Sequence, residues 1–197
     1  TCWNLSATYG TQDLPACGGA CTPNPYTGGC TCPAGYFATS IRRIIDCPSG
    51  VTYTGASTGL CATPTPGTFG GAFQVDLTCG RNCFLPNPYT RTCTCPAGTG
   101  LIFQADIVTD PACGRTAYAR TYVCGRGLGA LNLGGGFGGV FLSADPFGAT
   151  PQCRHANAIT GACSCPAGYG QQAYRVLIPQ AGSSLGYIGA WIYFCVQ

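Results

Sequence analysis

A cysteine pattern written three times constrains this chain more than any other feature. Its anchor reads C-T-C-P-A-G at Cys30–Gly35 and Cys93–Gly98, and C-S-C-P-A-G at Cys163–Gly168. Each copy has another cysteine nine or ten positions before the anchor and one more 29 or 30 positions after the anchor's second cysteine. Repeated spacing of this kind predicts three similar units, each stapled by disulfides.

Two further cysteines flank each of the first two copies and are missing together from the third. Copy one has Cys17 and Cys47, and copy two has Cys79 and Cys113, whereas copy three has Ala149 at the first place and no cysteine near the second. Loss of one partner alone would leave a reactive thiol, while loss of both costs only stability. We therefore expect the bridges Cys17–Cys47 and Cys79–Cys113.

The remaining four cysteines of each copy are expected to form two bridges. The alternatives are the same bridges with the two anchor cysteines exchanged, because residues i and i+2 of a strand face the same way, and a four-thiolate zinc site in copy three. We favour bonding the first anchor cysteine to the preceding one and the second to the closing one. The favoured bridges are Cys21–Cys30, Cys32–Cys61, Cys83–Cys93, Cys95–Cys124, Cys153–Cys163 and Cys165–Cys195.

Cys2 is the seventeenth cysteine and has no partner in this scheme. It stands where the closing cysteine of a preceding copy would stand, because 15 positions separate it from Cys17 and 18 separate Cys61 from Cys79. An odd cysteine in a secreted chain indicates a bond to another molecule or a free thiol, unless the true pairing leaves a different orphan. Cys2 is therefore a candidate for contact between subunits.

Composition predicts strands and loops with little or no helix. The chain has no Lys, Glu or Met, and 31 of its residues are Gly. These absences remove several of the best helix formers. An F-G-G-x-F strand also recurs before the second and third copies, at Phe69–Phe73 and Phe137–Phe141. We expect an all-β protein of three tandem disulfide-stapled modules, at residues 1–64, 65–127 and 128–197.

Cysteine content and charge narrow the class of protein. Seventeen cysteines among 197 residues indicate an oxidising compartment, so the chain is expected to be secreted, extracellular or at the cell surface. Only 8% of the residues are charged, with a formal net charge of +3. No basic stripe is present for nucleic acid, and no apolar run is long enough to span a membrane. A surface so poor in charge is either covered by uncharged polar groups or buried against other subunits.

The sequence holds no recognisable catalytic or cofactor motif. Nucleophile-elbow, zinc-protease and phosphate-loop patterns are absent, and the only histidine, His155, is interpreted as a solvated loop residue. The recurring Asp13, Asp76 and Asp145 are explained by Asx turns, in which the side chain caps its own backbone. We therefore expect a protein that is not an enzyme and that needs neither cofactor nor metal.

The segments C-x-C-P-A-G-Y at Cys30–Tyr36 and Cys163–Tyr169 resemble the C-x-C-x-x-G-Y piece of epidermal-growth-factor-like modules. In that family the next cysteine follows sooner than Cys47 or Cys113 does here, and copy three lacks it. The resemblance therefore implies neither a bridge pattern nor a calcium site for this chain.

The last strand of the third copy is rich in aromatic residues. Tyr187, Gly189, Trp191, Tyr193 and Cys195 share one face by the period of two. If this strand lies inside its module, the rings belong to the core, and if it lies at an edge, they form an adhesive surface. Trp191 and Tyr193 are thus candidate intersubunit residues.

These features predict a structural subunit of an extracellular polymer, such as a filament, pilus-like fibre, sheath or coat. The expected partner is another copy of the chain, joined head to tail by strand contacts and stabilised by disulfides. In the simplest arrangement, the amino terminus of one subunit continues the sheet that the carboxyl-terminal strand Gly186–Gln197 of another begins.

The alternative function is a secreted lectin or adhesin with three quasi-equivalent modules. The loops P-N-P-Y at Pro23–Tyr26 and Pro86–Tyr89 are rigid, because proline presets φ and restricts the residue before it. Tyr26 and Tyr89 would then stack on surface glycans, although a tyrosine that only covers a disulfide explains the pattern as well. Rigid stapled loops would also suit an inhibitor or toxin, but no reactive basic loop recurs in every copy.

Overall fold

The computed structural model describes residues 8–14, 21, 23–24, 27–46, 53–62, 69–78, 83–109, 117–126, 137–144, 151–179 and 187–196. Within these ranges the chain forms ten β-strands and no helix, which confirms the all-β expectation. The described residues include no helix of the length and apolarity needed to cross a membrane.

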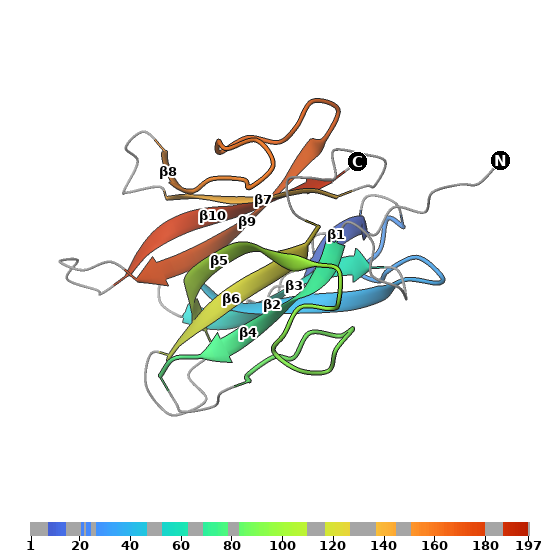
Figure 1. The fold of residues 1–197 in the computed structure, drawn as a ribbon. Helices are drawn as coiled ribbons and strands as arrows, with labels where there is room; N and C mark the ends of the chain where they lie inside the picture. Colours follow the sequence, from blue (N-terminus) through green and yellow to red (C-terminus); the bar gives the residue numbers. More distant parts are fainter. Residues whose placement is uncertain are drawn as a thin grey trace.

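The strands form three antiparallel sheets, and each sheet takes its strands from one of the three sequence repeats (Figure 1). Sheet 1 has the order β1-β3-β2, with β1 (Thr8–Leu14), β2 (Phe37–Asp46) and β3 (Tyr53–Ala62). Sheet 2 has the order β4-β6-β5, with β4 (Phe69–Asp76), β5 (Gly100–Thr109) and β6 (Ala117–Gly125). Sheet 3 has the order β8-β7-β10-β9, with β7 (Phe137–Ala144), β8 (Gln152–His155), β9 (Gly170–Pro179) and β10 (Tyr187–Val196).

The closing strand of each repeat lies in the middle of its sheet. β3, β6 and β10 each pair with the strand before the cysteine loop and with the strand after it. The expected module boundaries at 64/65 and 127/128 lie outside the described residues.

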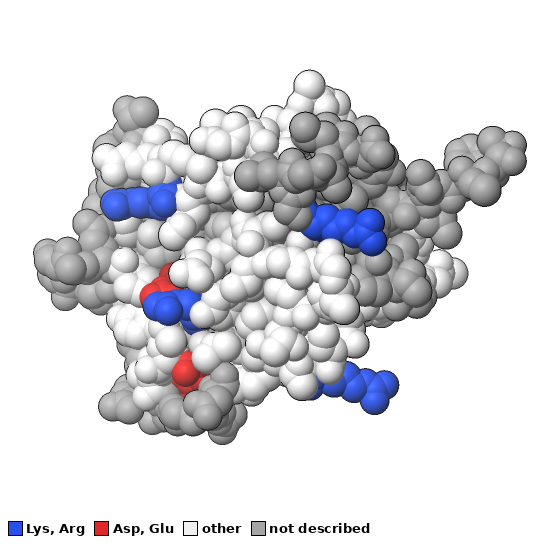
Figure 2. Space-filling view, in the orientation of Figure 1, with Lys and Arg blue, Asp and Glu red and all other residues white. Residues whose placement is uncertain are grey.

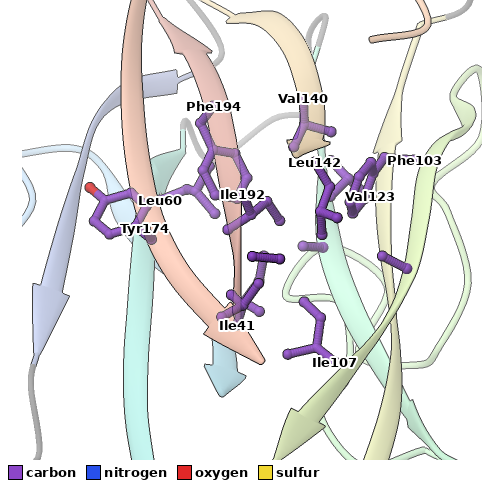
Figure 3. Packing of buried hydrophobic residues seen from close by; sticks show 14 of the residues in the cluster. Ile41, Leu60, Phe103, Ile107, Val123, Val140, Leu142, Tyr174, Ile192 and Phe194 are labelled. Atoms are coloured by element: carbon purple, nitrogen blue, oxygen red, sulfur yellow. The ribbon is translucent and has the colours of Figure 1, made fainter. Parts of the chain in front are cut away.

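The three sheets share the larger of two hydrophobic clusters among the described residues. It joins Ile41 and Leu60 of sheet 1 with Ile107 of sheet 2 and Phe194 of sheet 3, all of them almost fully buried (Figure 3). The strands that follow the anchor, β2, β5 and β9, contact one another around this core. One repeat of about 65 residues buries little apolar surface by itself, so the three repeats stabilise one another by packing into a common core.

Strand registers define equivalent positions in the three sheets. Arg42, Asp106 and Arg175 are equivalent, because each stands opposite the residue four positions before the closing cysteine of its copy. Gln74 and Leu142 are likewise equivalent, since each lies opposite the residue three positions before that cysteine.

β10 corrects the expectation for the aromatic strand. It lies between β7 and β9, so from Ala190 to Val196 it already has a partner strand on each side. Its aromatic face is nevertheless the outer one, with Trp191 and Tyr193 half-buried. The opposite face of β10 lies in the core. Its residues are apolar too, so both faces of the strand are apolar. The core-facing residues are Ile188, Ala190, Ile192, Phe194 and Val196.

Candidate functional site

Six disulfides staple the described part of the chain, two in each repeat. The second bridge of each repeat ties the loop to the closing strand, where Cys61, Cys124 and Cys195 are fully buried. The pairing is the one favoured from the spacing, and the four cysteines of copy three are bonded in pairs instead of being arranged as zinc ligands. The bridges are Cys21–Cys30, Cys32–Cys61, Cys83–Cys93, Cys95–Cys124, Cys153–Cys163 and Cys165–Cys195, with Cα–Cα distances of 5.4 to 6.1 Å.

The other cysteine predictions lie outside the described residues. These are the bridges Cys17–Cys47 and Cys79–Cys113 and the unpaired Cys2. They remain expectations.

One buried asparagine organises each disulfide loop. Asn24, Asn87 and Asn157 are fully buried, and each stands six positions before the anchor. The Asn157 amide donates to the carbonyl of Gly138 (2.9 Å), and its oxygen accepts from the backbone N–H of Ile159 (3.0 Å). Asn87 and Asn24 also place their amide near the buried sulfur of the closing disulfide. The loops are therefore built from the inside around a polar side chain, which satisfies buried backbone groups.

The double glycine of F-G-G-x-F lets this loop pack on the first strand of the repeat. Gly71 and Gly139 have φ of 86° and 93°, a conformation that L side chains rarely adopt. A Cβ at either position would collide with the amide oxygen of Asn87 or Asn157. The glycines thus serve the asparagine loop, and this explains why the motif precedes each cysteine loop in copies two and three.

The structure gives Tyr89 a packing role. Its half-buried ring meets Phe37 of sheet 1 edge-on, with the centroids 5.2 Å apart, and packs against the common core. The contact is with Phe37 and the core and involves no disulfide, so both roles given to Tyr89 from the sequence remain expectations. Tyr26 lies outside the described residues.

The outer face of sheet 3 carries the two candidate intersubunit rings. Tyr193 stacks on Phe141 across the strands, with centroids 4.5 Å apart and planes within 8°. The guanidinium of Arg175 lies 6.0 Å from the Trp191 ring. An open hollow of about 260 Å³ lies beside Tyr193 and is bordered by the Cys153–Cys163 bridge. This face therefore combines apolar rings with a depression and little charge.

Sheets 1 and 2 meet in a seam that polar side chains close. The buried side chain of Gln74 on β4 bonds to both backbone groups of Arg42 on β2, at 2.9 Å each, and donates to the hydroxyl of Thr121. Above it, the Arg42 guanidinium lies 5.7 Å from the centre of the Phe84 ring.

Sheets 2 and 3 meet in a different seam, which is hollow. Asp106 of β5 forms a two-pronged ion pair with Arg120 of β6, at 2.7 and 3.1 Å, and this contact holds the pKa of Arg120 above its usual value. Arg154 and His155 of β8 face the same hollow. Partial burial lowers the pKa of His155; Asp106 opposes this shift and Arg154 adds to it. Sequence reasoning missed this cluster, because nothing local in the chain links residues 104–106 to 154–155.

Within the described residues no three His, Cys, Asp or Glu side chains gather as metal ligands. Comparison with protein-family models, with curated proteins and with solved structures finds no significant match to this chain.

Proposed function

We propose that the chain is a structural subunit of an extracellular polymer whose copies join head to tail through edge strands. This proposal is supported by the position of β1 and β8, because each lies at the edge of its sheet and the two belong to different sheets. In Figure 1, β8 lies at the upper left and β1 to the right of the centre. An edge strand presents unpaired N–H and C=O groups that template pairing with another chain. A contact between two unlike edges is heterologous, so it repeats from copy to copy.

The composition of β1 agrees with such a role. Proteins usually protect an edge strand with charged side chains or proline, and β1 contains one charged residue, Asp13, and no proline. The register is regular from Thr11 to Leu14, where β1 pairs with β3. That stretch leaves a straight outer edge for a partner strand. All four residues of β8 are exposed, and among the described strands β8 pairs with β7 alone.

The surface chemistry also favours burial between copies. Most of the described surface visible in Figure 2 is neither acidic nor basic. A monomeric surface normally has about a quarter to a third of its residues charged. Covering an uncharged surface carries a small desolvation penalty, because few ions lose water. Disulfides as numerous as these are typical of an oxidising environment, and we propose the cell surface or its surroundings as the place of assembly.

The outer face of sheet 3 supplies a second contact in this proposal. Trp191 is half-buried, and its equivalent in sheet 1 is Ser57 and in sheet 2 Arg120. Replacing the indole with the residue that sheet 1 has there, Trp191→Ser, should weaken assembly while leaving the core intact. Arg120→Ser is the matched control on sheet 2 and should leave assembly unchanged.

Two neighbouring proline substitutions in β1 test the strand contact. Successive N–H groups of a strand point to opposite sides, so of Gln12→Pro and Asp13→Pro one removes an N–H from the open edge and the other breaks pairing with β3. The variant that removes only an outward N–H should keep the unfolding temperature close to that of the native chain but should form no elongated assemblies in the electron microscope. The variant that breaks pairing with β3 should lose stability as well.

If the proline variant that keeps its stability still assembles normally, β1 is not the junction.

Cys2→Ser tests whether a disulfide between copies through Cys2 stabilises the assembly in addition to the strand contact. We expect this variant to assemble in buffer and to come apart at lower denaturant concentration than the native chain.

A further inference from the structure

The seam between sheets 2 and 3 differs from the seam between sheets 1 and 2 at equivalent positions. In the first seam Arg42 lies over Phe84, and Gln74 fills the gap below. In the second seam Asp106 replaces Arg42 and Leu142 replaces Gln74. Because Cys83 and Cys153 are equivalent, Arg154 and His155 replace Phe84 and Leu85. The apolar Phe84 and Leu85 of the first seam are thus replaced by Arg154 and His155 in the second.

The exchange leaves an open hollow of about 630 Å³. Small-molecule sites typically enclose about 300 to 1,000 Å³. The polar wall comes from Gln104, Asp106 and Arg120 of sheet 2 and from Arg154 and His155 of sheet 3. Ile178 and Ile188, both buried, form an aliphatic floor. The hollow therefore offers hydrogen-bonding groups on its walls and an apolar surface beneath them.

The charges of the wall leave one cation available. Asp106 is paired with Arg120, whereas Arg154 has no ion-pair partner among the described residues. His155 stands next to Arg154 on the same strand and meets Phe103 edge-on, at 5.8 Å between centroids. A planar guanidinium beside an imidazole suits a carboxylate, which can accept two parallel hydrogen bonds.

We propose that this hollow binds a carboxylate-bearing sugar of the uronic acid class. The carboxylate pairs with Arg154 and His155, and the apolar face of the pyranose ring rests on the floor of Ile178 and Ile188. Ring hydroxyls donate to the outer lone pairs of Asp106 and bond to Gln104. The proposal uses side chains of β8, whereas assembly uses its main-chain edge, so the two can fail separately.

The chain reports on this site through its single histidine. One set of imidazole resonances belongs to His155, so titration of the full chain with glucuronate can be followed by NMR without ambiguity. We expect a saturable shift of these resonances. Glucose tests the ring without the charge, and acetate and sulfate test the charge without the ring; each should bind at least about tenfold more weakly, since a tenfold change corresponds to one good contact.

Variants at Arg154 give the decisive comparison. Arg154→Ala should lower glucuronate affinity at least about tenfold. Arg154→Phe introduces the residue that the first seam has at the equivalent position, Phe84, and should abolish binding. Arg42→Ala at the equivalent place in the first seam is the matched control and should leave affinity unchanged. Thermal unfolding of all three checks that the fold is retained.

Equal binding of glucose and glucuronate would overturn the proposal, as would equal binding of acetate, which would define a simple anion site. Unchanged affinity in Arg154→Ala would overturn it too. So would the absence of any shift of the His155 resonances at millimolar glucuronate.

Discussion

The side chain of Gln74 pairs with the backbone of Arg42 as a neighbouring strand would, accepting from its N–H and donating to its carbonyl at 2.9 Å each. These bonds join two different sheets, because Gln74 lies on β4 and Arg42 on β2. One buried amide thus links the first two repeats, whereas the equivalent residue of sheet 3 is the apolar Leu142.

Gln74→Leu should therefore destabilise the protein although leucine is the residue that sheet 3 has there. Loss of the Gln74 amide leaves the backbone N–H and C=O of Arg42 and the Thr121 hydroxyl without this partner. We expect a loss of about 1 to 3 kcal/mol in the free energy of unfolding. Denaturant unfolding with the disulfides intact measures this, with the exposed Gln171→Leu as the control. A Gln74→Leu chain as stable as the native one would show that the sheets are held by apolar packing alone.

Asn157→Ala should be among the most damaging single substitutions in the third repeat. The amide is fully buried and bonds to Gly138, Ser164 and Ile159. Removing it leaves several buried backbone groups unsatisfied, so we expect a loss of about 2 to 4 kcal/mol. Thr160→Ala removes exposed bonds in the same loop that water can replace, and it should cost less than about 1 kcal/mol. Similar losses for the two variants would contradict the central role of the asparagine.

Thr39→Val should stabilise the protein. The Thr39 hydroxyl is buried and has no hydrogen-bond partner among the residues that the structure describes, and valine keeps the side-chain volume without the polar atom. We expect a gain of about 1 kcal/mol in the free energy of unfolding, measured by thermal or denaturant melts. Thr121→Val is the control, because its hydroxyl accepts from Gln74 and its loss should destabilise. A destabilised Thr39→Val chain would mean that this hydroxyl is bonded in solution.

The pKa of His155 should lie below the ordinary value of 6.5, because partial burial disfavours the charged ring. The unfolded chain then takes up its proton at higher pH than the folded chain does. Stability from this group is therefore complete above pH 6.5 and falls as the pH drops through the window just below that value. An NMR titration of the native chain measures the pKa, and Arg154→Ala should raise it. A pKa at or above 6.5 in the native chain would contradict this environment.

The cysteine spacing predicted two bridges in each described repeat, but it left open which anchor cysteine bonds to which partner, because residues i and i+2 of a strand face the same way. The faces of β10 could not be assigned in the same way. Both sides of that strand are apolar, and period-two reasoning gave no ground to choose between Trp191 and Ile192 as the core residue. The position of Cys195 was the missed signal, since a loop bonded there covers the outer face.

The sequence analysis missed the role of the loop asparagine, because it explained the rigidity of the loop by the prolines beside Asn24 and Asn87. Copy three lacks those prolines but keeps Asn157 at the same distance from the anchor. The hollow near Asp106 had no sequence signal at all. It arises from packing between sheets, which brings Arg154 to residues some 50 positions earlier in the chain.

The most direct test of the proposed function is electron microscopy of the purified native protein, without added ligand, over a range of concentrations. Head-to-tail joining of β1 to β8 predicts elongated assemblies that lengthen with concentration and show one subunit repeat along their axis. Particles that stay monodisperse and the size of one chain, or that close into a dimer with a twofold axis, would contradict it.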